Sequence, residues 1–201
     1  MDILRTHEAS LYNAVISLAG IQTQVNYYGS GGSERYRSTT NVGRWQLDLS
    51  LSKLDLRQSK ELFSFLCLHG RAEPFLVRIK ELESRYQASE GVINVLDNVD
   101  TGKIITANNL PVSQIIASAG DFISFANHYK VYQLAQPVIS DNAGVAVLNL
   151  STPLAKPVNS TEIINFKKIY FKVALLEDLI SLDLDTYLMS GWTLKLEEVW
   201  R

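Results

Sequence analysis

The sequence has little of what disulfide-bonded, secreted or membrane-spanning proteins depend on. Cys67 is the single cysteine among 201 residues, so no disulfide can form within the chain. This predicts a reducing compartment, and the apolar surroundings of Cys67 predict a small core residue. The first ten residues have neither a basic segment nor a continuous apolar run, so we expect no signal peptide. No apolar run approaches the roughly 18 residues that span a bilayer, so we expect a soluble protein, made in a cytoplasm, without membrane insertion.

An excess of charge of either sign is also lacking. Nineteen Lys and Arg residues face 21 Asp and Glu residues, which gives a formal net charge of -2 and a pI near 5.9. No overall electric field therefore draws the protein to nucleic acid or to an anionic membrane. The 46% of hydrophobic residues is ordinary for a globular protein and is enough for one large core or two small ones.

Residues for metal binding or acid–base catalysis are few and scattered. His7, His69 and His128 have no second ligand at metal-like spacing, so we expect structural roles for all three. Cys67 and His69 are two apart on a predicted helix, which points their side chains in nearly opposite directions.

Two further patterns resemble binding sites only weakly. Asp183 and Asp185 alternate along a strand, which favours a solvated face over a cation site. Residues 29–35, "GSGGSER", lack the Lys-Ser/Thr pair of a phosphate-binding loop and predict a flexible loop or an arm. No catalytic, cofactor-binding or metal-binding residue is therefore predicted, and we expect no enzyme.

What the chain does have is framework, beginning at Gly43. Trp45, Leu47, Leu49 and Leu51 alternate with polar residues, which predicts a strand with one buried face. Asp55 with Gln58 predicts a helix cap, and Gly70 predicts the stop of that helix. Residues 75–80 alternate again, so this region is predicted as strand, helix, strand.

The flanking regions predict further strands. Val15, Leu18 and their neighbours are compatible with a helix, but residues 15–28 fit better as two strands that turn near Gly20. Short β-type runs separated by turns recur through residues 92–150, which favours a small sandwich or barrel. Residues 112–118 fit either a strand or a helical turn. The strand with Trp192, Leu194 and Leu196 must bury its tryptophan and is expected to pair with the sheet of Trp45.

The predicted fold class is therefore mainly β with one or two helices (α+β), in two domains. Residues 1–84 and 167–201 form a discontinuous, β-sandwich-like domain with a packed helix. Residues 85–166 form an inserted small β-barrel of the oligonucleotide/oligosaccharide-binding (OB) type.

A resemblance supports this division. The stretch "GRWQLDLSLSKLDLRQSKELFSFLCLHGRAEPFLV", with Trp45, Gly70, Arg71 and Phe75, resembles the strand–helix–strand region of distal tail proteins of siphophages, closest to the T-five-like type. The segments "GDFISF" and "VYQLAQPVISDNAGVAVLNLSTPL" resemble the barrel region of the same family. The resemblance covers roughly residues 43–155 and the last strand.

The resemblance implies a structural virion protein at the phage tail tip. Such a protein forms a ring, hexameric in this family, that joins the tail tube to the baseplate hub or central fibre. Side tail fibres or their collar are further possible partners, and nucleic acid is not one. The alternative prediction is a barrel module that binds carbohydrate or single-stranded nucleic acid through Tyr129 or Tyr132.

Overall fold

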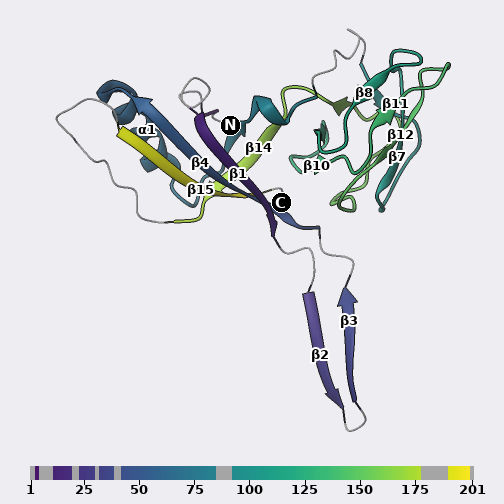
Figure 1. The fold of residues 1–201 in the computed structure, drawn as a ribbon, viewed down its shortest axis with the longest axis horizontal. Helices are drawn as coiled ribbons and strands as arrows, with labels where there is room; N and C mark the ends of the chain where they lie inside the picture. Colours follow the sequence, from purple (N-terminus) through teal and green to yellow (C-terminus); the bar gives the residue numbers. More distant parts are fainter. Residues whose placement is uncertain are drawn as a thin grey trace.

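The computed structural model describes residues 3–4, 11–19, 23–29, 32–38, 42–84, 92–177 and 190–199. Figure 1 shows a sheet with one helix, a second body of short strands, and a hairpin that points away from both. We call residues 92–166 the inserted unit, and the described residues before and after it, apart from the hairpin, the sheet unit. The mainly β fold with one packed helix is confirmed.

The sheet unit is built on five antiparallel strands in the order β1–β4–β15–β14–β5. Their bounds are β1 Leu11–Ala19, β4 Arg44–Leu54, β15 Ser190–Glu198, β14 Tyr170–Leu175 and β5 Phe75–Arg78. The last strand in chain order, β15, therefore lies in the middle of the sheet. Trp192 pairs with Leu51 and Leu196 with Leu47, so the predicted pairing with the strand of Trp45 is confirmed.

The two faces of this sheet differ in chemistry because side chains alternate along each strand. One face is apolar and buried, and β4 and β15 supply most of it: Trp45, Leu47, Leu49, Leu51, Trp192, Leu194 and Leu196. The opposite face carries mostly polar side chains, among them Gln46, Asp48, Ser50, Thr193, Lys195 and Glu197. Antiparallel sheets tolerate water on one face, so only the apolar face needs a cover.

Helix α1, Leu56–His69, covers one end of the apolar face. The Asp55 carboxylate accepts from the Gln58 N–H at 2.7 Å, and the Gln58 side chain accepts from the Asp55 N–H at 3.0 Å. This reciprocal cap satisfies two backbone donors at the helix start. The helix ends at Gly70, with φ +52°, and buries Leu62 and Leu66 against the sheet. The predicted helix and both of its boundaries are confirmed.

The inserted unit consists of short strands around a core of its own. The strands are β6 Asn94–Val95, β7 Ile104–Asn108, β8 Ile115–Ala117, β9 Phe122–Phe125, β10 Val131–Gln133, β11 Val138–Ile139, β12 Ala146–Asn149 and β13 Ile164–Asn165. They form three small sheets, β12–β7–β6, β10–β9–β13 and β8–β11. Residues 115–117 are a strand, which settles the two readings of residues 112–118. A 3₁₀ turn, Lys80–Leu82, leads from β5 toward this unit.

The two strands predicted within residues 15–28 are confirmed as β1 and β2, Thr23–Gly29, while the turn near Gly20 lies outside the described residues. Strand β2 pairs with β3, Gly32–Ser38. Two other expectations from the sequence need correction. Residues 32–35 belong to β3, so the flexible-loop interpretation of residues 29–35 was wrong for them. Cys67 is exposed, because it follows Leu66 on the solvent side of an amphipathic helix.

Gly144 offers a test of the inserted unit. Its φ is +72°, and a Cβ there would lie 2.5 Å from the Leu110 carbonyl oxygen. We expect Gly144→Ala to lower the free energy of unfolding by about 2–4 kcal/mol, through left-handed strain plus a steric clash. Gly120, at φ +94° with open space around it, is the matched control. Gly120→Ala should cost only about 1–2 kcal/mol in urea denaturation, and equal losses would contradict this packing.

Candidate functional site at the sheet edge and the unit junction

The residues considered from the sequence for metal or acid–base chemistry do not come together. His7, Asp183 and Asp185 lie outside the described residues. His69 is buried at the end of α1 with its ring 4.4 Å from that of Phe65, while His128 lies in the inserted unit. Within the described ranges, no three His, Cys, Asp or Glu side chains are grouped as a metal ion would require. The notable polar groups instead lie where the two units meet.

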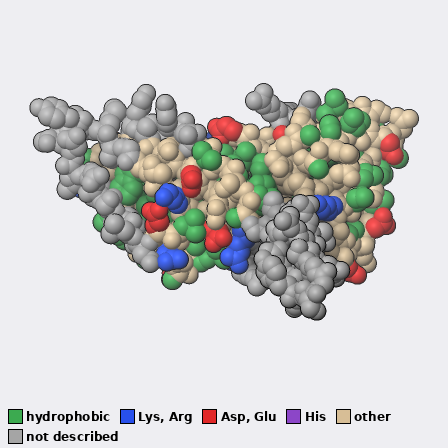
Figure 2. All heavy atoms as spheres, turned by 60° about the horizontal axis from the view of Figure 1, so that its bottom comes forward, with side chains coloured by type: hydrophobic (Ala, Val, Ile, Leu, Met, Phe, Trp, Pro, Cys, Tyr) green, Lys and Arg blue, Asp and Glu red, His purple; other side chains and the backbone are tan. Residues whose placement is uncertain are grey.

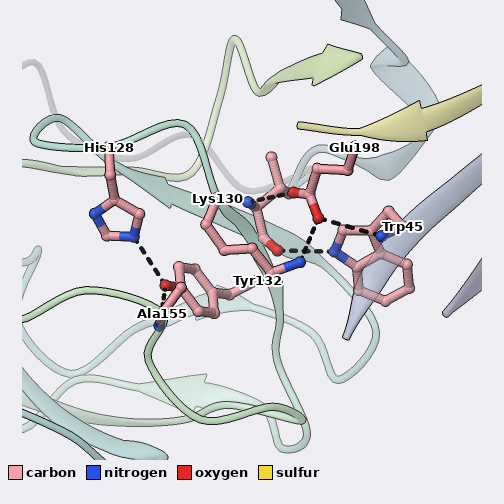
Figure 3. Close-up of polar contacts among 7 residues, drawn as sticks. Trp45, His128, Lys130, Tyr132, Ala155 and Glu198 are labelled. Carbon is pink, nitrogen blue, oxygen red and sulfur yellow. Dashed lines mark hydrogen bonds and ion pairs between the residues drawn. The ribbon is translucent and has the colours of Figure 1, made fainter. Parts of the chain in front are cut away.

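A buried junction joins the sheet unit to the inserted unit, and we define it by Trp45, Lys130, Val131 and Glu198 (Figure 3). Glu198 stands on β15, while Lys130 and Val131 lie at the start of β10. One Glu198 oxygen accepts hydrogen bonds from the Lys130 ammonium and from the backbone N–H of Trp45, the latter at 3.2 Å. The other oxygen accepts from the Val131 N–H at 2.9 Å. The Trp45 indole N–H donates to the Val131 carbonyl at 2.8 Å, which closes the network.

Neither charge of the junction reaches water, since the side chains of Lys130 and Glu198 are both 0% exposed. Burial raises the pKa of the Glu198 carboxyl and lowers the pKa of the Lys130 ammonium. The ion pair itself and the two backbone N–H donors act in the opposite direction on Glu198. Each charge is thus tolerable only while the other is present.

Aromatic packing surrounds the ion pair. Phe122 of β9 meets Trp45 edge to face with ring centroids 5.0 Å apart, and it meets Phe171 of β14 at 5.9 Å. The Lys130 nitrogen also lies 5.5 Å from the centre of the Trp45 ring. Phe122 and Val131 therefore belong to the core of the sheet unit, although the chain places them in the inserted unit. The inserted unit covers the end of the apolar face that α1 leaves open.

A second attachment lies where the chain passes between the units. Arg78 donates two hydrogen bonds to Glu83, at 2.6 and 2.9 Å, and Glu83 accepts from the Ile169 N–H at 3.1 Å. Although burial acts to raise it, these hydrogen bonds lower the pKa of Glu83. Ser84 further donates to the Ile116 carbonyl at 2.8 Å. The outgoing and returning segments are thereby held side by side.

His128 and Tyr132 form a polar pair beside the junction (Figure 3). Their side chains lie 2.8 Å apart, between His128 Nε2 and the Tyr132 hydroxyl, and that hydroxyl accepts from the Ala155 N–H at 2.9 Å. His128 Nδ1 contacts the side-chain oxygen Oδ1 of Asn127, and the amide nitrogen of the same side chain donates to the Pro157 carbonyl. This arrangement suits a neutral ring that donates through Nδ1 and accepts from tyrosine through Nε2. Burial, with Lys156 and Lys130 nearby, lowers the pKa of His128 to about 4.

The opposite boundary of the sheet unit is an open edge. Strand β1 pairs with β4 on one side, and no strand in the described part of the chain pairs with its other side. In the sequence, the hairpin of β2 and β3 connects β1 to β4. In space, it extends beyond the sheet (Figure 1). At the far edge, β5 is partly covered by Ile3 and Leu4, and Leu4 N–H donates to the Leu76 carbonyl at 3.0 Å. The two edges of the sheet are thus different.

The inserted unit exposes large apolar side chains on two of its sheets, Ile104 and Val147 on β7 and β12, and Ile115 and Ile139 on β8 and β11; we call these four residues together the apolar stripe. Ile115 pairs with Ile139 across two of these strands. Figure 2 shows hydrophobic side chains gathered over this unit with few charged ones between them. Tyr129 is 47% exposed, whereas Tyr132 is 0% exposed and cannot stack on a ligand in this fold.

Reasoning from the sequence missed Glu198 and Lys130. The signal for Glu198 was present, because it follows Trp192, Leu194 and Leu196 at the same two-residue spacing and must therefore face the core. A charge in a buried position needs a partner of opposite sign. Nothing local identifies Lys130 as that partner, since it is 68 residues away in the chain.

Comparison with protein-family models and with curated sequences identifies no relative. The chain matches no protein-family model, and no curated protein is significantly similar to it in sequence. Among the described residues, none of the helices has the length and apolar character to cross a membrane.

His128 predicts a pH dependence of stability. Its pKa in the folded protein, about 4, is below its ordinary value of 6.5, so folding favours the neutral ring. The resulting stabilisation is complete above pH 6.5 and is lost as the pH falls toward 4. Because the ring is partly accessible to water, we expect a loss of about 1–2 kcal/mol over this range. His128→Gln, which stays neutral, should flatten this part of the stability profile in urea titrations; an unchanged slope would contradict the assignment.

Proposed function

We propose that this protein is a structural component of a bacteriophage tail tip, which assembles with copies of itself into a ring joining the tail tube to the baseplate hub or central fibre. The ring is hexameric in the family that the sequence resembles, and the virion is the place of action. The observation that carries the proposal is the open edge of β1. The hairpin of β2 and β3, which continues the strand pair of β1 and β4 beyond the sheet, belongs to the same feature. Both present backbone groups that another chain can pair with.

An edge strand of nine residues whose outer side pairs with no strand of the described ranges is a template for association. A two-stranded hairpin is marginally stable by itself in water, so the ribbon of β2 and β3 gains from contact with a neighbour. Addition of a strand to an exposed edge supplies main-chain hydrogen bonds without any catalytic group. Since the two edges of the sheet differ, contact between unlike surfaces is favoured, and such contacts close into rings when the rotation permits.

The polar face of the sheet is compatible with a surface of the assembled ring that stays in contact with water. Its charges are largely matched: Arg44 lies 3.7 Å from Glu197, and Lys195 lies 2.7 Å from Glu177. Repeating this face around a ring would therefore concentrate little charge of one sign. The inserted unit packs on the opposite, apolar face, and its apolar stripe suits contact with another protein of the tail.

The alternative, a barrel that binds carbohydrate or single-stranded nucleic acid, has less support. Of the two tyrosines proposed to stack on a ligand, only Tyr129 is accessible, and the Lys172 nitrogen lies 5.1 Å from its ring centre. This alternative stays a prediction, and binding lost on Tyr129→Ala in a glycan array would favour it.

Charge placed on the open edge should block assembly. Val15 and Ser17 are exposed on β1, so Val15→Lys/Ser17→Lys adds two positive charges at the pairing edge. We expect association between copies, or with the hub partner, to weaken by about 100-fold or more, because lysine on an edge opposes strand pairing. Native mass spectrometry over a concentration series, with and without the partner, measures this effect.

The matched control is Gln46→Lys/Thr193→Lys, which adds the same charge to the same face on the two inner strands. It should assemble like the unaltered protein. Equal loss in both variants would show that charge, and not the edge, is responsible. Absence of the protein from purified virions, examined by mass spectrometry and electron cryomicroscopy, would refute the tail-tip function itself.

A further inference from the structure

The inserted unit is held to the sheet unit at two places of different character. Glu83 and Arg78 hold the crossing segments side by side at the base of the inserted unit. The buried junction acts farther along the chain, where Glu198 binds Lys130 and Val131 (Figure 3). The two connecting segments alone would allow the inserted unit to rotate about them, because they restrain its position at one place only. A second attachment away from that place removes this freedom.

The chemistry of the second attachment is poorly suited to stability alone. Both partners of the ion pair are withdrawn from water completely, and the loss of hydration offsets much of their attraction. Apolar packing around it, from Trp45, Phe122 and Phe171, already supplies adhesion between the units. Apolar contact, however, has no preferred direction, so it resists sliding weakly.

The hydrogen bonds of Glu198 do have direction. The carboxylate meets three donors from two parts of the chain: the Trp45 N–H, the Val131 N–H and the Lys130 ammonium. The Trp45 indole N–H adds a fourth bond, to the Val131 carbonyl. A small rotation of the inserted unit would break several of these bonds at once and leave a buried charge without its partner, which is costly.

We propose that the Lys130–Glu198 junction is an orientation lock: it holds the inserted unit in one orientation on the sheet unit, and its contribution to overall stability is secondary. The inserted unit, and with it the apolar stripe, is thereby presented at a fixed angle. This inference concerns a single chain and does not depend on the ring function proposed above.

The single native cysteine makes the test direct. Cys67 is exposed on α1 and takes one nitroxide label, and Val147→Cys, on the outer side of β12, takes the second. Double electron–electron resonance then measures the distance distribution between the two units in the full chain. For the otherwise unaltered protein, one narrow distribution is expected.

The decisive variant is Lys130→Met/Glu198→Leu, which replaces the ion pair by apolar side chains of similar volume. It also leaves the backbone N–H groups of Trp45 and Val131 without their acceptor, so we expect it to stay folded with a thermal midpoint lowered by roughly 5–15 °C. It should also broaden the distance distribution about twofold, as expected for units held by apolar contact and linkers alone. The matched control, Lys195→Met/Glu177→Leu, removes an exposed ion pair by the same substitutions and should leave the distribution unchanged.

A distribution as narrow in the folded Lys130→Met/Glu198→Leu variant as in the unaltered protein would overturn the lock. If circular dichroism shows that this variant does not fold, Glu198→Gln takes its place. This substitution keeps the volume of the side chain, but its amide N–H group replaces one oxygen that accepts from Lys130 or Val131. A narrow distribution there would overturn the proposal as well. Failure of both variants to fold would assign the pair to folding and would equally refute an orientation role.

Discussion

The structure depends on covering one apolar sheet face that is longer than a single helix. Trp45 and Trp192 mark the two ends of this face, because β4 and β15 run antiparallel and Trp192 pairs with Leu51 near the far end of β4. Helix α1 covers the end with Trp192, where Phe63 lies 6.4 Å from the indole ring. The inserted unit covers the end with Trp45. Each unit has a core of its own, but residues of both units pack together on this one apolar face.

Much of the sheet unit could be predicted from the sequence because its signals are local. The alternation from Trp45 to Leu51, the cap formed by Asp55 and Gln58, and the stop at Gly70 each depend on residues a few positions apart. The pairing of the last strand with that of Trp45 followed from the need to bury tryptophan. Strands β6, β7, β9, β10 and β12 of the inserted unit were predicted for the same reason, from short β-type runs between turns, whereas the two-residue strands β11 and β13 were not predicted.

What the sequence did not show depends on contacts between distant residues. Glycine and serine suggested a loop for residues 32–35, but pairing with β2 overrides that weak local preference. Cys67 was placed in the core from the apolar character of its neighbours, whereas the helical period turns it outward. The junction was missed because Glu198 contacts residues of β4 and β10, and no local pattern of a single chain links these three segments.

The central position of β15 has a consequence for biosynthesis. A chain leaves the ribosome in order, so β1, β4, α1 and β5 emerge first and the inserted unit follows, long before the strand that must lie between β4 and β14. Until β15 emerges, the sheet is divided into two parts, β1–β4 and β14–β5, and one edge of β4 lacks its partner strand. The inserted unit, with its own core, can fold during this interval, but Glu198 can bind Lys130 only after β15 has emerged. A chain that lacks β15 thus differs from one that has it in whether the sheet is complete.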